Sequence, residues 1–319
     1  MKVITCRNYG TPEELRLEIW GTPTPKKNEI RIKNHNTSVN SADWRLRKPD
    51  PKLVRLFFGL TKPRQPVLGA SVSGVVDAVG KNVTKFKLGD RVFGSTGMKM
   101  GAYAESVCIS ESSVIKILPQ EISFPEGAAL PFGSLTALDF IQKCNIQKDQ
   151  TIIIYGASSS VGTSTIQLAK HFGATVTAVC SKGNFKIVQS LGATTVMDYE
   201  EFHSETHQKK YDIVFECVGK STIPSNLRVL SKDGVLVLVG ATFKEMFQAS
   251  WLSLTKKIKI KFGPITESLE NLEFLTELTK NGKFKVFIDK SYPLEKIPEA
   301  HRYVEAGHKK GNVVIDIFS

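Results

Sequence analysis

The feature that most constrains this chain is a short apolar segment that runs directly into a tight turn and then into a helix-forming segment. Residues 152–155 (IIIY) are apolar and mostly β-branched, residues 156–162 (GASSSVG) form the turn, and residues 163–170 (TSTIQLAK) favour a helix. A turn this small lets backbone N–H groups and the positive end of a helix dipole approach a pyrophosphate. The segment therefore predicts a nucleotide cofactor, and with it chemistry that the cofactor carries.

The turn alone does not decide the fold, because Ser159 and Ser160 stand where a G-x-G-x-x-G pattern would place glycine, and an ordinary polar turn fits equally well. The following residues favour the nucleotide-binding interpretation, since short apolar runs alternate with helix-like segments. The strand-like runs lie at 175–180, 195–197, 213–215 and 235–240. This alternation is typical of a parallel sheet covered on both faces, and it predicts a Rossmann doubly wound domain.

The N-terminal third has a different pattern, in which short β-like runs are separated by Gly and Pro turns. These runs lie at 30–33, 72–76, 91–94 and 113–117. They predict a compact, mostly antiparallel, barrel-like domain. Near the C-terminus an amphipathic helix at 267–280 precedes strands near 287 and at 313–315. The sequence therefore predicts an α/β protein in which residues 1–122 and 265–319 form one domain and residues 123–264 form the nucleotide-binding domain.

Composition restricts the class of protein. The chain is 41% hydrophobic and 23% charged, and its longest apolar runs have the length of a strand. A membrane-spanning helix needs roughly 20 apolar residues, so we expect no transmembrane segment. The first 20 residues lack an apolar signal segment, and the five cysteines include no C-x-x-C pair. These features predict a cytoplasmic location, where thiols stay reduced.

The net charge of +12 raises the question of a polyanionic partner, either nucleic acid or an anionic lipid surface. A lysine-rich surface together with a site for a phosphorylated cofactor explains the same excess. Residues 256–262 (KKIKIKF) alternate lysine with apolar residues, as an edge strand does. No basic face interleaved with aromatic residues is present, so we do not expect nucleic acid as the main partner.

Eight segments, taken in their order along the chain, resemble the zinc-free quinone oxidoreductase (zeta-crystallin-like) branch of the medium-chain dehydrogenase/reductase superfamily. They are residues 40–43 (NSAD), 74–80 (GVVDAVG), 86–92 (FKLGDRV), 101–105 (GAYAE), 133–138 (GSLTAL), 156–162 (GASSSVG), 212–219 (DIVFECVG) and 310–314 (KGNVV). The resemblance implies a GroES-like catalytic domain with a Rossmann domain inserted before its last segment. We expect a homodimer.

The resemblance also implies that the site holds no zinc. In zinc-dependent relatives cysteine and histidine hold the metal, whereas Asn40 and Ala70 stand at the corresponding positions. His203 and His207 are four residues apart, but they lack a third ligand and are better explained as a solvated helix face. Without a Lewis acid the oxidation of a simple alcohol is difficult. A quinone or conjugated enone is already electrophilic and needs only positioning and modest hydrogen bonding.

The choice of cofactor depends on the residues after the second strand of the nucleotide domain. An NAD site usually has an acidic residue about 20 positions beyond the glycine turn. Here Ser181 and Lys182 follow the strand, and Lys186 lies close by in sequence. These side chains suit the 2′-phosphate of NADPH, although a simple polar turn is the alternative. The resemblance adds Tyr199 near the same phosphate. The turn itself contributes Gly156, Ala157, Ser158, Ser159, Ser160, Val161 and Gly162.

The resemblance places five residues around the nicotinamide: Asn40, Thr136, Val218, Gly240 and Asn312. The side chains of Asn40 and Thr136 offer neutral hydrogen bonds that orient a carbonyl or carboxamide. Asp43 either orients Asn40, relays a proton to the product, or caps the helix that begins near Trp44. Trp44 and Tyr103 are candidates for the substrate pocket, and packing inside its own domain is the alternative for Tyr103. The basic and apolar segment 46–65 forms either a lid or a helix packed on its own domain.

The sequence thus predicts an NADPH-dependent, zinc-independent reductase that transfers hydride to a quinone or conjugated enone. A second enzymatic interpretation is an alkenal or enoyl double-bond reductase. Two interpretations from other classes remain open. One is an NADPH-binding regulator or RNA-binding protein without turnover, and the other is a protein that binds an anionic membrane surface.

Overall fold

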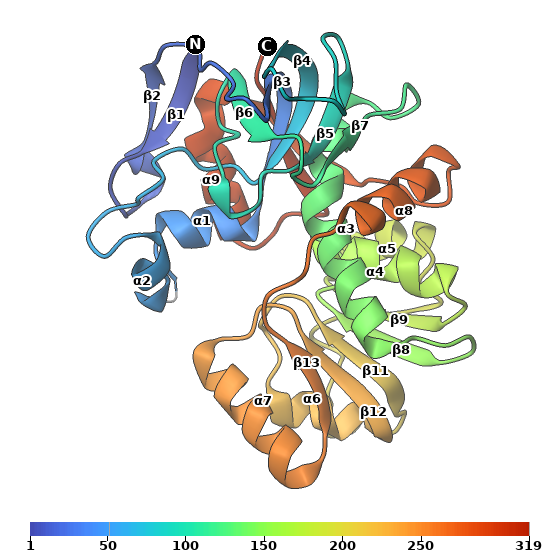
Figure 1. Cartoon of the computed structure of the whole chain (residues 1–319). Coiled ribbons are helices and arrows are strands. Elements are labelled where there is room, and N and C mark those ends of the chain that lie inside the picture. The colour runs from blue at the N-terminus through green and yellow to red at the C-terminus, as the bar shows by residue number, and fades with distance from the viewer. Residues whose placement is uncertain (51, 319) are drawn as a thin grey trace. The chain divides into compact units, whose positions relative to one another are not determined.

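The computed structural model describes residues 1–50 and 52–318, in two units that each have their own sheet (Figure 1). The first unit consists of Met1–Phe132, Glu267–Asn281 and Val286–Ser319, and the second of Gly133–Thr266 and Gly282–Lys285. The predicted α/β fold class, with a mostly-β unit and a parallel-sheet unit, is confirmed. The predicted domain boundaries after residues 122 and 264 stay a prediction.

The second unit is built on six parallel strands. They are β8 (Thr151–Tyr155), β9 (Thr175–Val179), β10 (Thr195–Met197), β11 (Tyr211–Glu216), β12 (Leu230–Leu238) and β13 (Lys259–Phe262). Their order in the sheet is β10-β9-β8-β11-β12-β13, so the direction of winding reverses between β8 and β11. Ile152, Ile153 and Ile154 are all buried. A strand buried on both faces explains the unbroken apolar run in the sequence.

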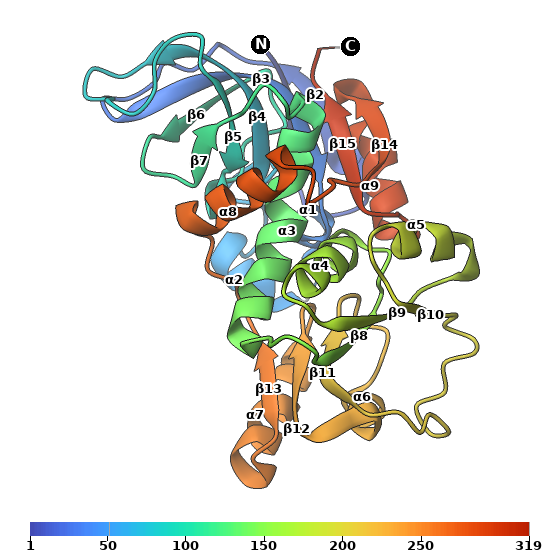
Figure 2. The same ribbon diagram turned by 90° about the vertical axis from the view of Figure 1, so that its right-hand side faces the viewer.

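Helices connect these strands (Figure 2). They are α4 (Ser160–His171), α5 (Phe185–Ser190), α6 (Ile223–Val229) and α7 (Phe243–Lys256). The chain enters the second unit along α3 (Phe124–Cys144). The connection from β10 to β11, residues 198–210, contains no helix. None of the helices in the part of the chain that the structure describes is both long and apolar enough to cross a membrane.

The first unit contains a mostly antiparallel sheet. Its strands are β3 (Glu29–Val39), β4 (Ser71–Val79), β5 (Arg91–Ser95), β6 (Ser106–Ser110), β7 (Ile115–Ile117), β14 (Ile288–Pro293) and β15 (Asn312–Asp316). The order is β14-β15-β3-β4-β5-β7, with β6 also paired to β3. Strands β1 (Lys2–Cys6) and β2 (Leu15–Ile19) form a separate antiparallel pair. The helices are α1 (Ser41–Arg47), α2 (Arg55–Phe58), α8 (Leu269–Lys280) and α9 (Ile297–Glu305).

Two local expectations are wrong or need adjustment. His203 and His207 lie in a turn rather than on a helix, and the His207 ring stacks on Tyr211 at a centroid distance of 5.7 Å. Of the lysine-rich segment 256–262, only Lys259–Phe262 is a strand, because Lys256 still belongs to α7. That strand does lie at an edge of its sheet, as predicted.

The segment 46–65 forms α1, a short 3-10 helix (Lys52–Val54) and α2, and residue 51 lies outside the described residues. Val54 and Phe58 pack against the core of the first unit, whereas Leu53, Leu56 and Leu60 are exposed. The contacts of Val54 and Phe58 support the alternative in which the segment 46–65 packs on its own domain. The lid stays a prediction.

Candidate functional site

The candidate cofactor residues of the second unit gather at one edge of its sheet. The turn from Gly156 follows β8, Ser181 and Lys182 follow β9, Tyr199 follows β10, Val218 follows β11, and Gly240 follows β12. In a parallel sheet all carboxyl ends of the strands lie at the same edge. Ligands of doubly wound folds bind outside that edge, where the winding reverses. Five separate segments of sequence therefore converge on one place.

The turn after β8 requires glycine at both of its ends. Gly156 has a φ of +80°, and a Cβ there would lie 2.6 Å from Cγ1 of Val218. A Cβ on Gly162 would lie 2.4 Å from the carbonyl oxygen of Gly156. These close approaches bring the first turn of α4 directly over the strand. Its backbone N–H groups are thereby presented at the carboxyl edge of the sheet.

The three serines of the turn have different surroundings. The hydroxyl of Ser159 accepts the N–H of Gly162 at 3.1 Å and so caps α4. The hydroxyl of Ser158 accepts a hydrogen bond from Nδ2 of Asn184 at 3.0 Å. Ser160 is buried, and its Oγ lies where a Cβ on Gly133 of α3 would be, at 2.1 Å. Phosphate binding by these hydroxyls stays a prediction, whereas the helix-capping role of Ser159 is visible.

The loop after β9 holds the residues predicted to bind a 2′-phosphate. Nζ of Lys182 lies 2.8 Å from a carboxylate oxygen of Glu201, and both side chains are exposed. An exposed ion pair contributes only about 0–1 kcal/mol, so a phosphate can displace Glu201 at little cost. The backbone N–H of Lys182 donates to Asp198 at 2.7 Å, which holds the loop against β10. Neither oxygen of Asp198 is free, since the other accepts the N–H of Glu200 at 2.8 Å.

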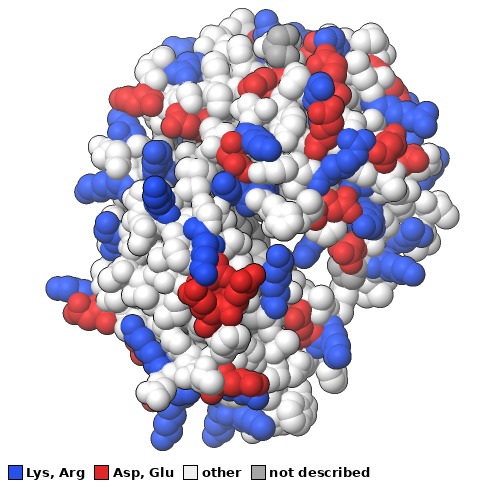
Figure 3. Space-filling view, turned by 180° about the vertical axis from the view of Figure 1, so that it is seen from behind, with Lys and Arg blue, Asp and Glu red and all other residues white. Residues whose placement is uncertain are grey.

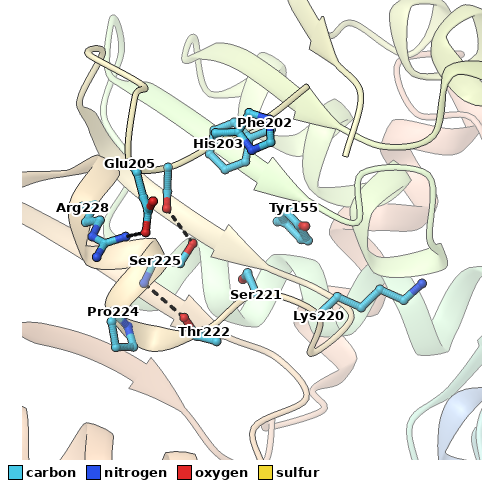
Figure 4. A pocket seen from close by; sticks show the side chains of 11 residues that line it. Tyr155, Phe202, His203, Glu205, Lys220, Ser221, Thr222, Pro224, Ser225 and Arg228 are labelled. Atoms are coloured by element: carbon cyan, nitrogen blue, oxygen red, sulfur yellow. Dashed lines mark hydrogen bonds and ion pairs between the residues drawn. The ribbon is translucent and has the colours of Figure 1, made fainter. Parts of the chain in front are cut away.

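A cavity of about 490 Å³ opens at the carboxyl ends of β8 and β11 (Figure 4). Its lining is Tyr155, Phe202, His203, Ser204, Glu205, Lys220, Ser221, Thr222, Pro224, Ser225 and Arg228. The Tyr155 and Tyr199 rings lie beside each other with centroids 4.9 Å apart. Glu205 pairs with Arg228 at 2.5 Å on the wall formed by α6. Aromatic faces combined with polar groups suit a base and a sugar.

In the first unit, strand pairing brings two candidates together. Val39 of β3 pairs with Val313 of β15, so Asn40 and Asn312 lie next to each other at the ends of antiparallel neighbours. Nδ2 of Asn312 donates to the carbonyl oxygen of Phe287 at 3.1 Å. Nδ2 of Asn40 donates to the hydroxyl of Ser38 at 3.0 Å. The side chain of Asn40 is thus held by neutral groups.

Ser71, the residue after Ala70, is also neutral. The Ser71 hydroxyl lies 2.6 Å from that of Ser38, and both side chains are fully buried. Asn40, Ser38 and Ser71 therefore form an uncharged chain of hydrogen bonds. A site lined in this way can orient a carbonyl, but it adds no charge of its own.

Asp43 is an ionisable group in contact with Asn40, and it is fully buried. Its carboxylate accepts the backbone N–H of Asn40 at 2.7 Å and that of Gly69 at 3.1 Å. Burial raises the pKa of Asp43 to about 7, while these hydrogen bonds and one from the Tyr103 hydroxyl act in the opposite direction. Asp43 is the third residue of α1, so the bond to Asn40 both caps the helix and fixes Asn40.

The two residues predicted for the substrate pocket differ in exposure. Trp44 is partly buried, and the guanidinium of Arg45 lies 5.5 Å from the centre of its ring. Tyr103 is fully buried, and its hydroxyl lies 3.0 Å from Nε2 of His301. Contact of either residue with substrate stays a prediction. Thr136 is buried on α3, in the second unit, and its catalytic role also stays a prediction.

Two polar residues near Asp43 were missed in the sequence. His301 and Arg47 are both fully buried, and Nε of Arg47 donates to Nδ1 of His301 at 3.4 Å. The only signal in the sequence was the spacing of Asp43 and Arg47, which places an acid and a base on one helix face. Within residues 1–50 and 52–318, no three His, Cys, Asp or Glu side chains are grouped so that they could hold a metal ion.

Comparison with known proteins covers both units. Residues 26–120 match the alcohol dehydrogenase GroES-like domain, and residues 191–315 match the family described as zinc-binding dehydrogenase. The chloroplast envelope quinone oxidoreductase homolog of Arabidopsis thaliana is 33% identical over 307 residues, which span 92% of this chain and 91% of that protein. The 2-methylene-furan-3-one reductase of Solanum lycopersicum is 31% identical over 328 residues, spanning 99% and 79%.

Solved structures agree with this relationship. The quinone oxidoreductase from Coxiella burnetii has a TM-score of 0.90 and 28% identity, and the match covers 100% of this chain and 99% of the other. The sequence similarity extends over nearly the whole length, so it includes the cofactor turn and the Asn40 segment alike. The chain belongs to the quinone oxidoreductase branch of the medium-chain dehydrogenase/reductase superfamily.

Proposed function

We propose that this protein is an NADPH-dependent reductase that transfers hydride to a quinone or a conjugated enone. The observation that carries the proposal is the convergence of five cofactor segments at the carboxyl edge of one parallel sheet, with a basic rather than acidic residue after β9. The names of the Arabidopsis and tomato relatives, a quinone oxidoreductase homolog and a furanone reductase, support both acceptor classes.

The residues of the second unit fit a phosphorylated dinucleotide. The N–H groups at the start of α4 would bind the pyrophosphate, Ser181 and Lys182 the 2′-phosphate, and the cavity beside Tyr155 the adenosine. When bound, NADPH supplies the hydride. The position after β9 carries no carboxylate to bond a ribose 2′-hydroxyl, which is why NADPH is proposed over NADH.

We propose that the reaction does not use zinc, because an amide and a methyl group stand at positions 40 and 70. Neither is an imidazole or thiolate ligand. The acceptor must then be electrophilic before it binds, which favours quinones and enones over simple ketones. Asn40 would orient the carbonyl of the acceptor through its amide, and Thr136 is proposed as a second hydrogen-bonding residue. The carbonyl oxygen finally gains a proton from solvent, while Asp43 holds the backbone of Asn40.

The decisive experiment is steady-state oxidation of NADPH, with NADH in parallel, against quinones, enones and alkenals in metal-free buffer. We expect turnover with NADPH, weaker turnover with NADH, and no effect of a chelator. Turnover confined to alkenals would favour the double-bond reductase. Tight NADPH binding without turnover of any acceptor would contradict the reductase and favour a regulator. RNA binding that NADPH displaces, or binding to anionic vesicles, would identify the remaining alternatives.

We further propose a homodimer, which would bury an apolar stripe on α7. Phe243, Phe247, Trp251 and Leu254 recur at helical spacing on this helix and are between 46% and 83% exposed. Exposed apolar patches of this kind commonly mark a protein contact. A symmetric dimer covers the same patch on both copies. The edge of β13 is a poorer dimer contact, because pairing it with the same edge of a second copy would bring the lysines of the two copies, Lys259 and Lys261, together.

Introducing charge into this stripe should separate the subunits. Trp251→Glu would place a carboxylate in the apolar contact of both copies, at a cost of several kcal/mol per dimer. We expect sedimentation velocity to show a dimer for the wild type and a dissociation constant at least about 100-fold higher for the variant. Leu88→Glu is the control, because Leu88 is similarly exposed in the first unit. A wild-type monomer, or a variant that remains dimeric, would refute the α7 contact.

A cytoplasmic location is also proposed. All five cysteines are free, which suits a reducing compartment. The charge excess need not indicate nucleic acid. On the face seen in Figure 3, Lys and Arg side chains are interspersed with Asp and Glu. This arrangement differs from the continuous basic stripe that follows a phosphate backbone.

A further inference from the structure

Asp43 belongs to a ring of four side chains inside the first unit, in which three side-chain contacts join the members and the backbone of α1 joins Asp43 to Arg47. Asp43 and Arg47 lie one turn apart on α1, His301 lies on α9, and Tyr103 lies in the loop before β6. All four residues are 0% exposed. Polar groups that have lost contact with water must satisfy one another's hydrogen bonds. The ring is therefore a constrained arrangement rather than a loose cluster.

The contacts of the ring connect its members in one order. Nε of Arg47 lies 3.4 Å from Nδ1 of His301, and Nε2 of His301 lies 3.0 Å from the hydroxyl of Tyr103. The Tyr103 hydroxyl in turn acts on the carboxylate of Asp43 as a donor that lowers its pKa. The other nitrogens of Arg47 donate to the carbonyl oxygen of Gly10 and to Glu305. The guanidinium is thus fixed on three sides.

These partners determine the direction of each hydrogen bond. A guanidinium can only donate, so Nδ1 of His301 must accept. The proton of the neutral imidazole then lies on Nε2 and is donated to the oxygen of Tyr103. The hydroxyl proton of Tyr103 is left to point at Asp43. The permanent charge of Arg47 therefore orients every hydrogen bond of the ring toward the carboxylate.

The fixed direction of these hydrogen bonds also prevents the four side chains from conducting a proton to Asp43. Passage from the surface to Asp43 would need a proton to enter His301 at Nδ1, where Nε of Arg47 donates and does not give up its own proton. Burial and the nearby charge of Arg47 lower the pKa of His301 to about 3, so the imidazole stays neutral. The ring orients Asp43 but does not reprotonate it.

Few other ionisable groups face the ring. Glu305 and Lys48 pair with each other at 2.7 Å, outside Arg47. Cys6 of β1 lies near Arg47 and Tyr103, and burial raises the pKa of its thiol to about 11, so it stays neutral. The carboxylate of Asp43 is therefore the group of this cluster that changes charge near neutral pH.

We propose that Arg47, His301 and Tyr103 are positioning residues of the reductase site. Together they direct the hydroxyl proton of Tyr103 toward Asp43, and this hydrogen bond keeps the carboxylate in place to accept the N–H of Asn40. The inference rests on the proposed function, in which Asn40 orients the acceptor. An ionised Asp43 accepts from Asn40, Gly69 and Tyr103 together. A protonated carboxyl must donate with one oxygen, so one of these three bonds is lost and Asn40 is less firmly held.

Tyr103→Phe removes the hydroxyl while keeping the aromatic ring of residue 103, which packs on Gly69. We expect the pKa of Asp43 and the acid limb of the kcat profile to move up together by about one unit. Turnover would fall about tenfold near pH 6 and less than about twofold near pH 9. Tyr211→Phe is the matched control, because Tyr211 is also buried and bonds a histidine, His207, at 3.1 Å in the second unit.

The readout that does not depend on activity is ¹³C NMR of aspartate-labelled protein, with Asp43 assigned through Asp43→Asn. A shifted Asp43 titration supports the ring even if no acceptor is reduced by any variant, and in that case only the proposed function fails. Normal turnover with an unchanged Asp43 titration in Tyr103→Phe overturns the ring.

A second measurement needs no variant that alters the ring. The ¹⁵N spectrum of histidine-labelled wild-type protein distinguishes the two neutral tautomers of His301. We expect the Nε2-protonated form throughout the range from about pH 5 to pH 9. The Nδ1-protonated form would make Tyr103 a donor to His301, and it would overturn the proposal whatever the kinetics show.

Discussion

Gly162→Ala should weaken NADPH binding by at least about 100-fold, or about 2.7 kcal/mol. The new Cβ would lie 2.4 Å from the carbonyl oxygen of Gly156 and 2.7 Å from the backbone of Ala157. Neither neighbour is a flexible side chain, so the first turn of α4 must move away from β8. The N–H groups that we propose for the pyrophosphate then lose their alignment, and each charge-assisted hydrogen bond is worth about 1.5–3 kcal/mol.

Titration calorimetry with NADPH measures this effect directly. The control is Gly21→Ala, since a Cβ on Gly21 meets no atom within 4 Å. Circular dichroism would establish that the Gly162 variant is folded. An affinity for NADPH within about fivefold of the wild type would show that the cofactor does not use the start of α4.

Asp43→Asn should change how the free energy of unfolding depends on pH, and not only the value of that free energy at one pH. The pKa of Asp43 is raised from 3.8 to about 7 in the folded state. Between these values the folded protein holds a proton that the unfolded chain has released, so this group lowers stability as pH rises. The pKa of His301 is lowered from 6.5 to about 3. Between those values only the unfolded chain binds the proton, so this group lowers stability as pH falls.

From about pH 4 to pH 6.5 the two contributions therefore have opposite slopes and nearly cancel. Removing Asp43 leaves the slope of His301 alone. The free energy of unfolding of the variant should then rise relative to wild type by about 1.4 kcal/mol per pH unit, or about 3 kcal/mol across the window.

Urea unfolding at several pH values between about 4 and 6.5 gives the slope. The asparagine also places an amide group near backbone donors, which lowers stability at every pH, so the slope and not the offset is diagnostic. Asp50→Asn is the control, because Asp50 is exposed in the same unit. A variant whose pH slope equals that of the wild type would show that Asp43 is already ionised near pH 4.

The parallel sheet could be predicted because buried strands have an unmistakable sequence. The runs at 152–155 and 235–239 are unbroken and β-branched, which a strand covered on both faces allows. The expected helix at His203 and His207 rested on a spacing of four without an apolar period beside it, and that spacing also occurs in turns. Ser181 was identifiable because it follows the end of a predicted strand, whereas Asn40 was identified through the family resemblance.

The ring around Asp43 could not be predicted, for a physical reason. His301 and Tyr103 are 198 residues apart, and His301 meets Arg47 because α9 packs beside α1. Sequence periodicity shows which face of a helix is buried, but not what lies against it. The adjacency of Asn312 and Asn40 likewise depends on the pairing of β15 with β3 and not on any local pattern.

That pairing has a consequence for how the protein is made. Asn36 and Ile315 share a hydrogen bond across a sequence separation of 279 residues, and β15 lies between β14 and β3 rather than at a sheet edge. On the ribosome, residues 133–266 emerge well before β15. The nucleotide unit can therefore mature while β3 still exposes the unpaired strand edge that ends at Asn40. A nascent chain would then acquire its cofactor before its catalytic pocket, and chaperones would have to protect that open edge in the interval.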